Sequence, residues 1–187
     1  MDRASAFIKT AQPKKEIRED PLAFRRILDA GWWGQMKIHG HHAQIHLSSN
    51  QGEECLVYNR HGKLHARSLD EELSTELRRI LHLESGWSAI EAEWLKNEKK
   101  LFLFDYIKFN GQVLSSSSYE ERYQLLPRLY RSDCIATLPV LRTVEECLQV
   151  MKNTEPYIEG LVFKSRCTVG FSSHSIVRCR KTDRRNG

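Results

Sequence analysis

Short segments in which apolar and polar residues roughly alternate constrain the fold of this sequence most. Residues 32–38 and 43–47 form two such segments around Gly40, and a polar Ser-Ser-Asn-Gln-Gly link leads into a third at 54–59. A period of two residues between turn-forming links predicts β-strands. We therefore expect an antiparallel meander in this part of the chain.

The rest of the sequence mixes further strands with amphipathic helices. Periods of three to four residues predict helices at 21–30, 68–83, 119–130 and 144–152. Runs of β-branched, aromatic and other large apolar residues predict strands at 90–95, 101–109, around 135–141, near 160–164 and at 176–180. The sequence thus predicts an α+β fold, mainly antiparallel sheets flanked by helices.

Length and composition favour one globular domain. The chain has 187 residues, 40% of them hydrophobic and 28% charged, which suits a single packed core. Pro13 and mixed charge without a period mark residues 1–20 as an N-terminal arm. We predict a domain over 21–182 and a basic tail over 183–187.

Charge and cysteine usage indicate the environment and the kind of partner. The net charge is +5, and basic residues crowd the last ten positions, which favours a polyanionic partner such as nucleic acid. The five cysteines are scattered singly, which fits the reducing cytoplasm. No stretch approaches the roughly 20 apolar residues of a membrane span, so we expect no membrane association.

The sharpest local pattern is Lys37-Ile38-His39-Gly40, at the end of a predicted strand. A lysine beside glycine can approach a phosphate closely, and its amine becomes a nucleophile where nearby cations or desolvation favour the uncharged form. A pattern this short is not specific by itself. Its interpretation depends on the segments that follow.

Five further segments follow in order: Asn-Arg-His-Gly-Lys at 59–63, Ile-Glu-Ala-Glu-Trp at 90–94, Leu-Phe-Asp-Tyr at 103–106, Glu-Gly-Leu-Val-Phe-Lys at 159–164 and Ile-Val-Arg-Cys-Arg at 176–180. From about Trp32 to Lys181 the sequence resembles the covalent nucleotidyltransferase superfamily, which comprises ATP-dependent DNA ligases, RNA ligases and messenger-RNA capping enzymes. The resemblance implies the nucleotidyltransferase fold of the DNA ligase catalytic core, an ATP-grasp-like architecture.

In that family the motif lysine takes AMP from ATP and passes it to a 5′-phosphate, which a 3′-hydroxyl then attacks. The resemblance implies that Lys37 is this lysine and that Glu159 supports it as a second catalytic residue. It also implies ATP and Mg²⁺, or Mn²⁺, as cofactors. Glu93 and Glu159 are the implied metal ligands.

The resemblance also assigns the residues that bind the nucleotide. Phe104 would stack on adenine, and Glu93 would lie near the ribose. The phosphates would contact a set of basic side chains: Arg60, Lys164, Arg178, Arg180, His39 and His42. Both lysines of the family's last motif are arginine here, at positions 178 and 180, so the charge is kept while a planar fork replaces a compact ammonium.

Two histidines depart from the DNA ligase pattern. His39 stands in place of aspartate and His42 in place of arginine. Lys-Ile-His-Gly is the form typical of type 2 and editing RNA ligases, whereas the segment at 59–63, the run from Phe104 to Gly111 and the following helix match DNA ligases. We expect a ligase that slightly prefers DNA; the alternatives are an RNA ligase and a module that binds nucleotides or nucleic-acid ends without catalysis.

Two expectations concern further ligands and partners. His39, His41, His42 and His46 do not indicate zinc, because strand alternation separates them and no cysteine pair accompanies them. DNA ligases and capping enzymes continue into an OB domain, whereas this sequence ends at Gly187. The chain is then a fragment, receives this function from a partner chain, or acts on pre-adenylated ends; we expect a monomer.

Overall fold

The computed structural model describes residues 6–50, 52–127 and 130–181. They form two compact units. Unit 1 combines the residues up to Lys9 with Gly40–Leu138, and unit 2 combines Thr10–His39 with the residues from Pro139 onward. Each unit buries its own hydrophobic cluster, so the single core expected from the length is divided. The predicted boundaries at 20 and 182 stay predictions, and 183–187 lie outside the described residues.

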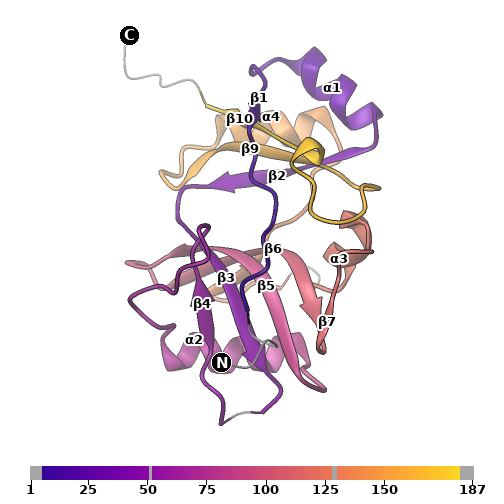
Figure 1. The fold of residues 1–187 in the computed structure, drawn as a ribbon. Coiled ribbons are helices and arrows are strands. Elements are labelled where there is room, and N and C mark those ends of the chain that lie inside the picture. The colour runs from indigo at the N-terminus through magenta and orange to yellow at the C-terminus, as the bar shows by residue number, and fades with distance from the viewer. Residues whose placement is uncertain (1–5, 51, 128–129, 182–187) are drawn as a thin grey trace. The chain divides into compact units, whose positions relative to one another are not determined.

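Unit 1 is built on a six-stranded sheet in the order β4-β3-β5-β6-β7, with β8 beside β6 (Figure 1). Its strands are β3 (His41–Ser48), β4 (Leu56–Tyr58), β5 (Trp87–Leu95), β6 (Lys100–Phe109), β7 (Gln112–Val113) and β8 (Ile135–Thr137). All pairs are antiparallel except β6 with β8. The meander expected over 32–38, 43–47 and 54–59 is wrong for its first segment: residues 43–47 and 54–59 contribute paired strands here, whereas residues 32–38 belong to the sheet of unit 2.

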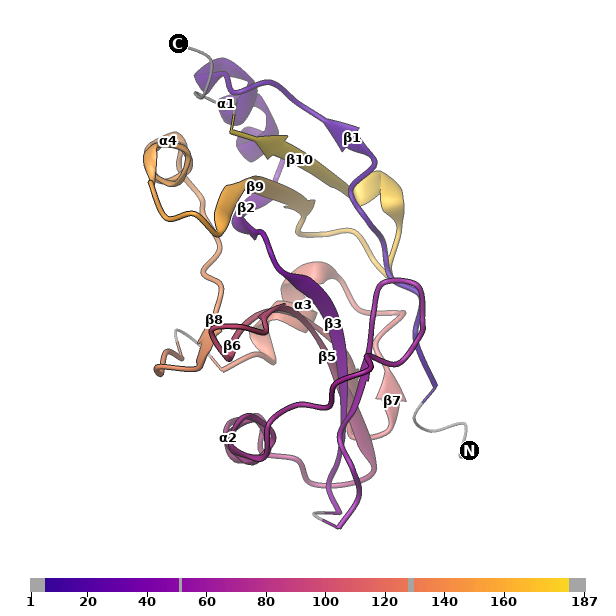
Figure 2. The ribbon, with the colours of Figure 1, turned by 90° about the vertical axis from the view of Figure 1, so that its left-hand side faces the viewer.

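One face of this sheet is apolar and covered by a helix. Ala43, Ile45 and Leu47 alternate along β3 toward a cluster completed by α2 (Glu71–Leu81), which lies against one face of the sheet and is seen end-on in Figure 2. The intervening residues of β3 are polar yet buried, among them Gln44 and His46. The opposite face of the sheet is therefore a buried polar surface.

Helix α3 (Tyr119–Gln124) is tied to the sheet by a buried ion pair. Ser118 and Glu121 form a capping box at its start. The Arg122 guanidinium donates from Nε and Nη2 to the two Asp105 carboxylate oxygens at 2.9 and 3.1 Å. This contact ties Asp105 on β6 to α3.

Unit 2 is built on a four-stranded sheet in the order β1-β10-β9-β2, comprising β1 (Lys15–Glu16), β10 (Ile176–Arg180), β9 (Ile158–Ser165) and β2 (Trp32–Ile38). A short 3-10 turn (Ser173–Ser175) precedes β10. Helices α1 (Pro21–Asp29) and α4 (Val144–Lys152) pack on one face, where Phe24 and Cys147 meet Leu161, Phe163 and Cys179 (Figure 2). The other face carries most of the polar side chains of the sheet.

Several element boundaries differ from the sequence prediction. The helix expected over 68–83 spans Glu71–Leu81, and the helix expected over 119–130 ends at Gln124, ahead of Pro127. The strands expected at 54–59 and around 135–141 shorten to Leu56–Tyr58 and Ile135–Thr137. Strand β1 lies in the segment expected to be an arm and pairs in parallel with β10.

Among the residues described, no helix has the length and apolar character needed to cross a membrane.

Candidate functional site

In unit 2, strand register brings motif residues onto one face of the sheet. Lys37 on β2 pairs with Gly160 on β9, which pairs with Arg180 on β10. Arg178 lies two positions from Arg180 on the same strand, and the intervening Cys179 is buried in the core. Because side chains alternate across a strand, Lys37, Arg178 and Arg180 share the face away from α1 and α4. We call this surface the lysine face.

Close backbone packing excludes a side chain at Gly160, in the middle of the lysine face. Its φ is +148°, and a Cβ built there would lie 2.1 Å from the backbone oxygen of Cys179. No side chain thus stands between Lys37 and Arg180, whose strands are separated by one strand and so by roughly 10 Å.

A β-bulge turns Glu159 toward Lys37. The register of β2 and β9 shifts between Lys37, which pairs with Gly160, and Ile38, which pairs with Ile158, so Glu159 is the extra residue. Its carboxylate forms an ion pair with the Lys37 ammonium and accepts from His39 Nδ1 at 3.2 Å. The bulge thus joins two residues that are far apart in the sequence.

The contacts of Glu159 hold it in the ionised form. Burial alone would raise the pKa of this carboxyl, but the hydrogen bond and charge of Lys37, with a smaller contribution from His39, lower the pKa below its ordinary value. A carboxylate of this kind is a weak base. Its chemical use is to orient an amine or to bind a cation rather than to accept a proton.

Arg180, at the end of β10, borders a cavity of about 820 Å³ in unit 2. Glu159, Arg180, Lys181 and Glu16 are among its lining residues. The Glu16 carboxylate accepts from Arg178 Nε at 3.1 Å and lies 3.4 Å from Arg180 Nη2. Glu16 was not among the residues that the sequence singled out, and no pattern in the sequence marks it.

Lys164 lies apart from the other predicted residues of unit 2. It pairs with Trp33 on β2, four residues along the strand from Lys37. At the rise of a strand this corresponds to roughly 13 Å along the sheet. Lys164 is on the lysine face by alternation, but its role at the same phosphate as Lys37 stays a prediction.

The polar face of unit 1 carries a buried histidine and glutamate in contact. His42 Nε2 is bonded to a Glu91 oxygen, and Gln44 Nε2 donates to the other at 2.8 Å. Burial alone would lower the pKa of His42, but the charge and hydrogen bond of Glu91, together with Glu93, raise it above its ordinary value. His42 therefore carries a positive charge more readily than an ordinary histidine.

The other predicted residues of unit 1 lie around His42. Glu93 is its cross-strand partner on β5. Phe104 is the extra residue of a second bulge, between the pairs Ala92–Leu103 and Glu91–Asp105, and its ring centroid is 6.3 Å from that of His42. The exposed Arg60, in the turn after β4, contributes to the electrostatics at His42. Unit 1 therefore brings an aromatic ring, a cation and two carboxylates together.

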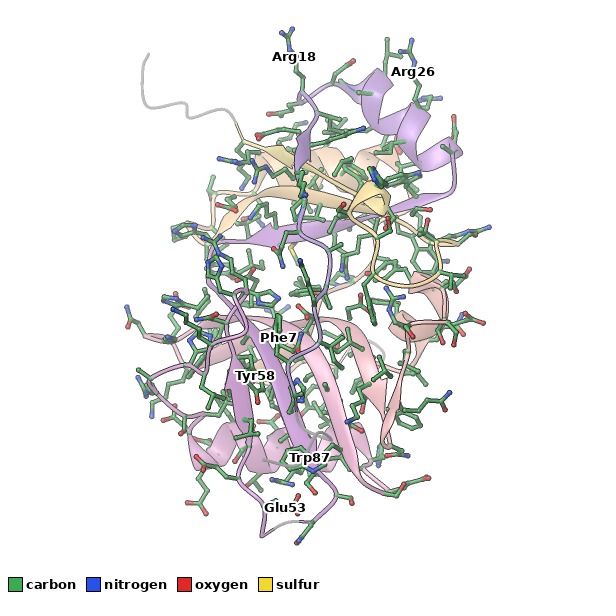
Figure 3. All side chains as sticks on the ribbon, in the orientation of Figure 1. Phe7, Arg18, Arg26, Glu53, Tyr58 and Trp87 are labelled. Atoms are coloured by element: carbon green, nitrogen blue, oxygen red, sulfur yellow. The ribbon has the colours of Figure 1, made fainter. Side chains whose placement is uncertain are left out.

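Glu91 and Gln44 were missed as site residues by sequence reasoning. Glu91 lies in the Ile-Glu-Ala-Glu-Trp segment, so the signal for an acidic residue was present, but only Glu93 was selected from it. Gln44 carried no signal. Its amide binds both backbone groups of Ile8, donating to the oxygen at 2.7 Å and accepting from the nitrogen at 2.8 Å. Phe7, next to Ile8, packs on Tyr58 (Figure 3).

The carboxylates fit Mg²⁺ better than a metal held by protein ligands alone. In the parts of the chain that the structure describes, no group of three or more His, Cys, Asp or Glu side chains could hold a metal ion. Mg²⁺ is commonly bound through one or two carboxylates, substrate phosphates and water. Glu159 on unit 2 and Glu93 on unit 1 each supply one oxygen donor group of the kind this ion prefers.

Comparisons with known proteins relate the fold of this chain to that of DNA ligases. No protein-family model matches the chain, and no curated protein matches its sequence. Among solved structures, mycobacterial DNA ligase D complexed with ATP and MES matches with a TM-score of 0.59 and 12% identity, over 96% of this chain and 62% of that one. The chain has the fold of a DNA ligase nucleotidyltransferase core.

Two other structures support the same fold. The ligase domain of LigD from M. tuberculosis matches with a TM-score of 0.59 and 14% identity, over 91% of this chain and 59% of that one. A Lig E DNA ligase matches with a TM-score of 0.54 and 14% identity, over 93% of this chain and 69% of that one. The chain spans about three fifths of the length of the ligase D structure. At these sequence identities, the similarity to the ligase structures is a similarity of fold.

Proposed function

We propose that this chain is the adenylation core of an ATP-dependent polynucleotide ligase, with Lys37 as the residue that accepts AMP. The observation that carries the proposal is the Lys37–Glu159 ion pair on a sheet face that also holds Arg178 and Arg180. A nucleophilic amine beside convergent cations is the arrangement that attack on a phosphate needs.

In the first step the uncharged Lys37 amine attacks the α-phosphorus of ATP. A P–N bond forms, the bond between the α-phosphorus and the bridging oxygen breaks, pyrophosphate leaves and the lysine proton passes to solvent. Arg178 and Arg180 stabilise the charge that develops on the phosphate oxygens. Glu159 orients the amine, and His39, exposed at the end of β2, contacts the phosphates.

Residues of unit 1 bind the rest of the nucleotide in this proposal. Phe104 stacks on adenine, Glu93 contacts the ribose, and His42 and Arg60 contact phosphate. Glu93 and Glu159 are each proposed as an oxygen donor for Mg²⁺ or Mn²⁺, which would neutralise phosphate charge when bound. The ligase D structure holds ATP by its own description, and we extend that ligand to this chain.

We propose nicked DNA as the substrate whose 5′-phosphate receives the AMP, with a 3′-hydroxyl then displacing it. The ligase structures of similar fold are DNA ligases. The Lys-Ile-His-Gly segment supports RNA as the second candidate. Pre-adenylated nicks of all-DNA and of RNA-containing duplex separate these candidates: faster sealing of the DNA nick is the expected outcome.

Labelling with ATP tests the proposal directly. We expect the purified chain, incubated with α-labelled ATP and Mg²⁺, to retain acid-labile label. Lys37→Ala and Lys37→Arg should abolish it, because arginine keeps the charge but is not a nucleophile. Lys152→Ala, on the exposed side of α4, is the matched control and should keep it.

The alternative is a module that binds nucleotides or nucleic-acid ends without joining them. The observation in its favour is that histidines stand at positions 39 and 42, where the DNA ligase pattern has aspartate and arginine. Nucleotide binding without any label in the wild-type chain would support this module and would contradict the adenylation proposal.

A further inference from the structure

A carboxylate from the N-terminal segment joins the two arginines of β10. A single oxygen of Glu16, Oε2, lies 3.1 Å from Arg178 Nε and 3.4 Å from Arg180 Nη2. The side chains of Glu16, Arg178 and Arg180 are 44%, 28% and 46% exposed. They are therefore paired with one another and still accessible to a ligand.

Strand β1 places Glu16 where it can make both contacts. Glu16 pairs in register with Arg178, and the Ile17 amide donates to the Arg178 carbonyl oxygen at 2.9 Å. Residues paired across two strands project from the same face, and Arg180 follows Arg178 on that face. The backbone of β1 thus fixes the carboxylate beside both guanidinium groups.

The contact with Glu16 leaves hydrogen-bonding capacity on both arginines. A guanidinium carries five N–H donors in a rigid fork. The contacts with Glu16 use one nitrogen of each arginine. Each fork can therefore bind a phosphate while one of its edges is held by the carboxylate.

We propose that Glu16 is a positioning residue, which orients the Arg178 and Arg180 guanidinium groups toward the phosphates of a bound nucleotide. The inference rests on the proposed function, because it takes the lysine face as the phosphate site. It also explains how arginine can replace the compact lysine of the family motif at both positions. Because the arginine side chain is long and flexible, its rigid fork must be held at one edge before it can meet a phosphate in a defined geometry.

Two opposing effects of Glu16 on nucleotide affinity decide whether its removal weakens or strengthens binding. Immobilising an arginine on binding costs about 2- to 13-fold in affinity, and Glu16 has already immobilised two. A carboxylate also repels a phosphate, by about fivefold for unit charges 4 Å apart in water. The orienting effect on two side chains exceeds this repulsion over most of that range, so removal of Glu16 should weaken nucleotide binding.

Calorimetric titration with α,β-methylene-ATP and Mg²⁺ tests the inference without requiring catalysis. We expect Glu16→Ala to raise the Kd about threefold to tenfold. Glu16→Gln, which keeps an oxygen that can accept from both arginines, should stay within about twofold of the wild type. Glu19→Ala is the matched control, since Glu19 lines the same cavity and its removal changes the charge equally.

Three results would overturn the positioning role: unchanged or tighter binding in Glu16→Ala, equal weakening in Glu16→Ala and Glu19→Ala, or no binding of the analogue by the wild-type chain. Tighter binding would identify Glu16 as an inhibitor that competes with phosphate. In the labelling assay Glu16→Ala should raise the KM for ATP more than it lowers kcat. Label without an effect of Glu16 refutes only this inference, whereas analogue binding without label refutes the adenylation proposal.

Discussion

Replacing Arg122 by methionine should lower the free energy of unfolding of unit 1 by about 3–5 kcal/mol. Methionine keeps an unbranched apolar stem but removes the cation from Asp105. The two side chains are only 5% and 11% exposed, so the carboxylate would be left in a site that water hardly reaches. Arg122 also donates to the Ser117 carbonyl oxygen at 2.9 Å, and that contact is lost as well.

The geometry of the ion pair supports this magnitude. Two donors of Arg122 reach two oxygens of Asp105 at 2.9 and 3.1 Å. Hydrogen bonds to charged groups contribute about 1.5–3 kcal/mol each, so two of them contribute about 3–6 kcal/mol. With an m-value near 2 kcal/mol/M, a loss of 4 kcal/mol lowers the urea midpoint by roughly 2 M.

Urea unfolding followed by tryptophan fluorescence measures the loss, and hydrogen exchange of β5 and β6 amides assigns it to unit 1. Arg67→Met is the control, because the Arg67–Asp70 pair is 50% and 28% exposed and should contribute less than about 1 kcal/mol. The double variant Arg122→Met/Asp105→Leu should recover much of the loss. The reasoning is refuted if Arg122→Met costs no more than Arg67→Met, or if the double variant recovers nothing.

Two further predictions concern the sheets. Burial, assisted by Lys108, lowers the pKa of His46 to about 4, so the unfolded chain binds a proton there first and stability falls as pH drops from about 6.5 toward 4. The free energies of unfolding measured in urea at pH 7 and pH 5 should differ by roughly 2 kcal/mol more in the wild type than in His46→Gln, and equal differences would contradict this origin. Gly160→Ala should lower the stability of unit 2 by at least about 1–3 kcal/mol, since it strains φ and meets the Cys179 oxygen. Thermal unfolding should show a smaller loss for Gly31→Ala, whose φ is also positive but whose surroundings are open, and equal losses would exclude the clash as the cause.

Much of the fold could be predicted from the sequence because local periods report which side of an element is buried. Strands β2 and β10 have the predicted bounds, and α4 does as well. The same alternation puts Arg178 and Arg180 on one face, so their sharing a surface follows from sequence spacing. That Lys37 and Arg180 lie level with each other depends on the register of β2, β9 and β10. The alternation of residues along one strand does not reveal how strands are paired.

What the sequence did not reveal depends on contacts between distant segments. Strand β1 is two residues long and carries no alternation that could distinguish it from an arm. Glu16 gains its importance only from pairing with β10. The division of the core into two hydrophobic clusters could not be predicted from the sequence either. Both clusters contain the same kinds of apolar residue, and each unit combines separate stretches of the chain.

The bulges at Glu159 and Phe104 have a consequence for comparing this chain with distant relatives. Each adds one residue to one strand of a pair, so the inward and outward positions exchange beyond it. A sequence alignment that ran through either point without a gap would pair the core positions of one protein with the solvent positions of the other. Similarity between true relatives would then be lost in the neighbourhood of the residues that define the chemistry, which makes strand geometry the better guide to ancestry here.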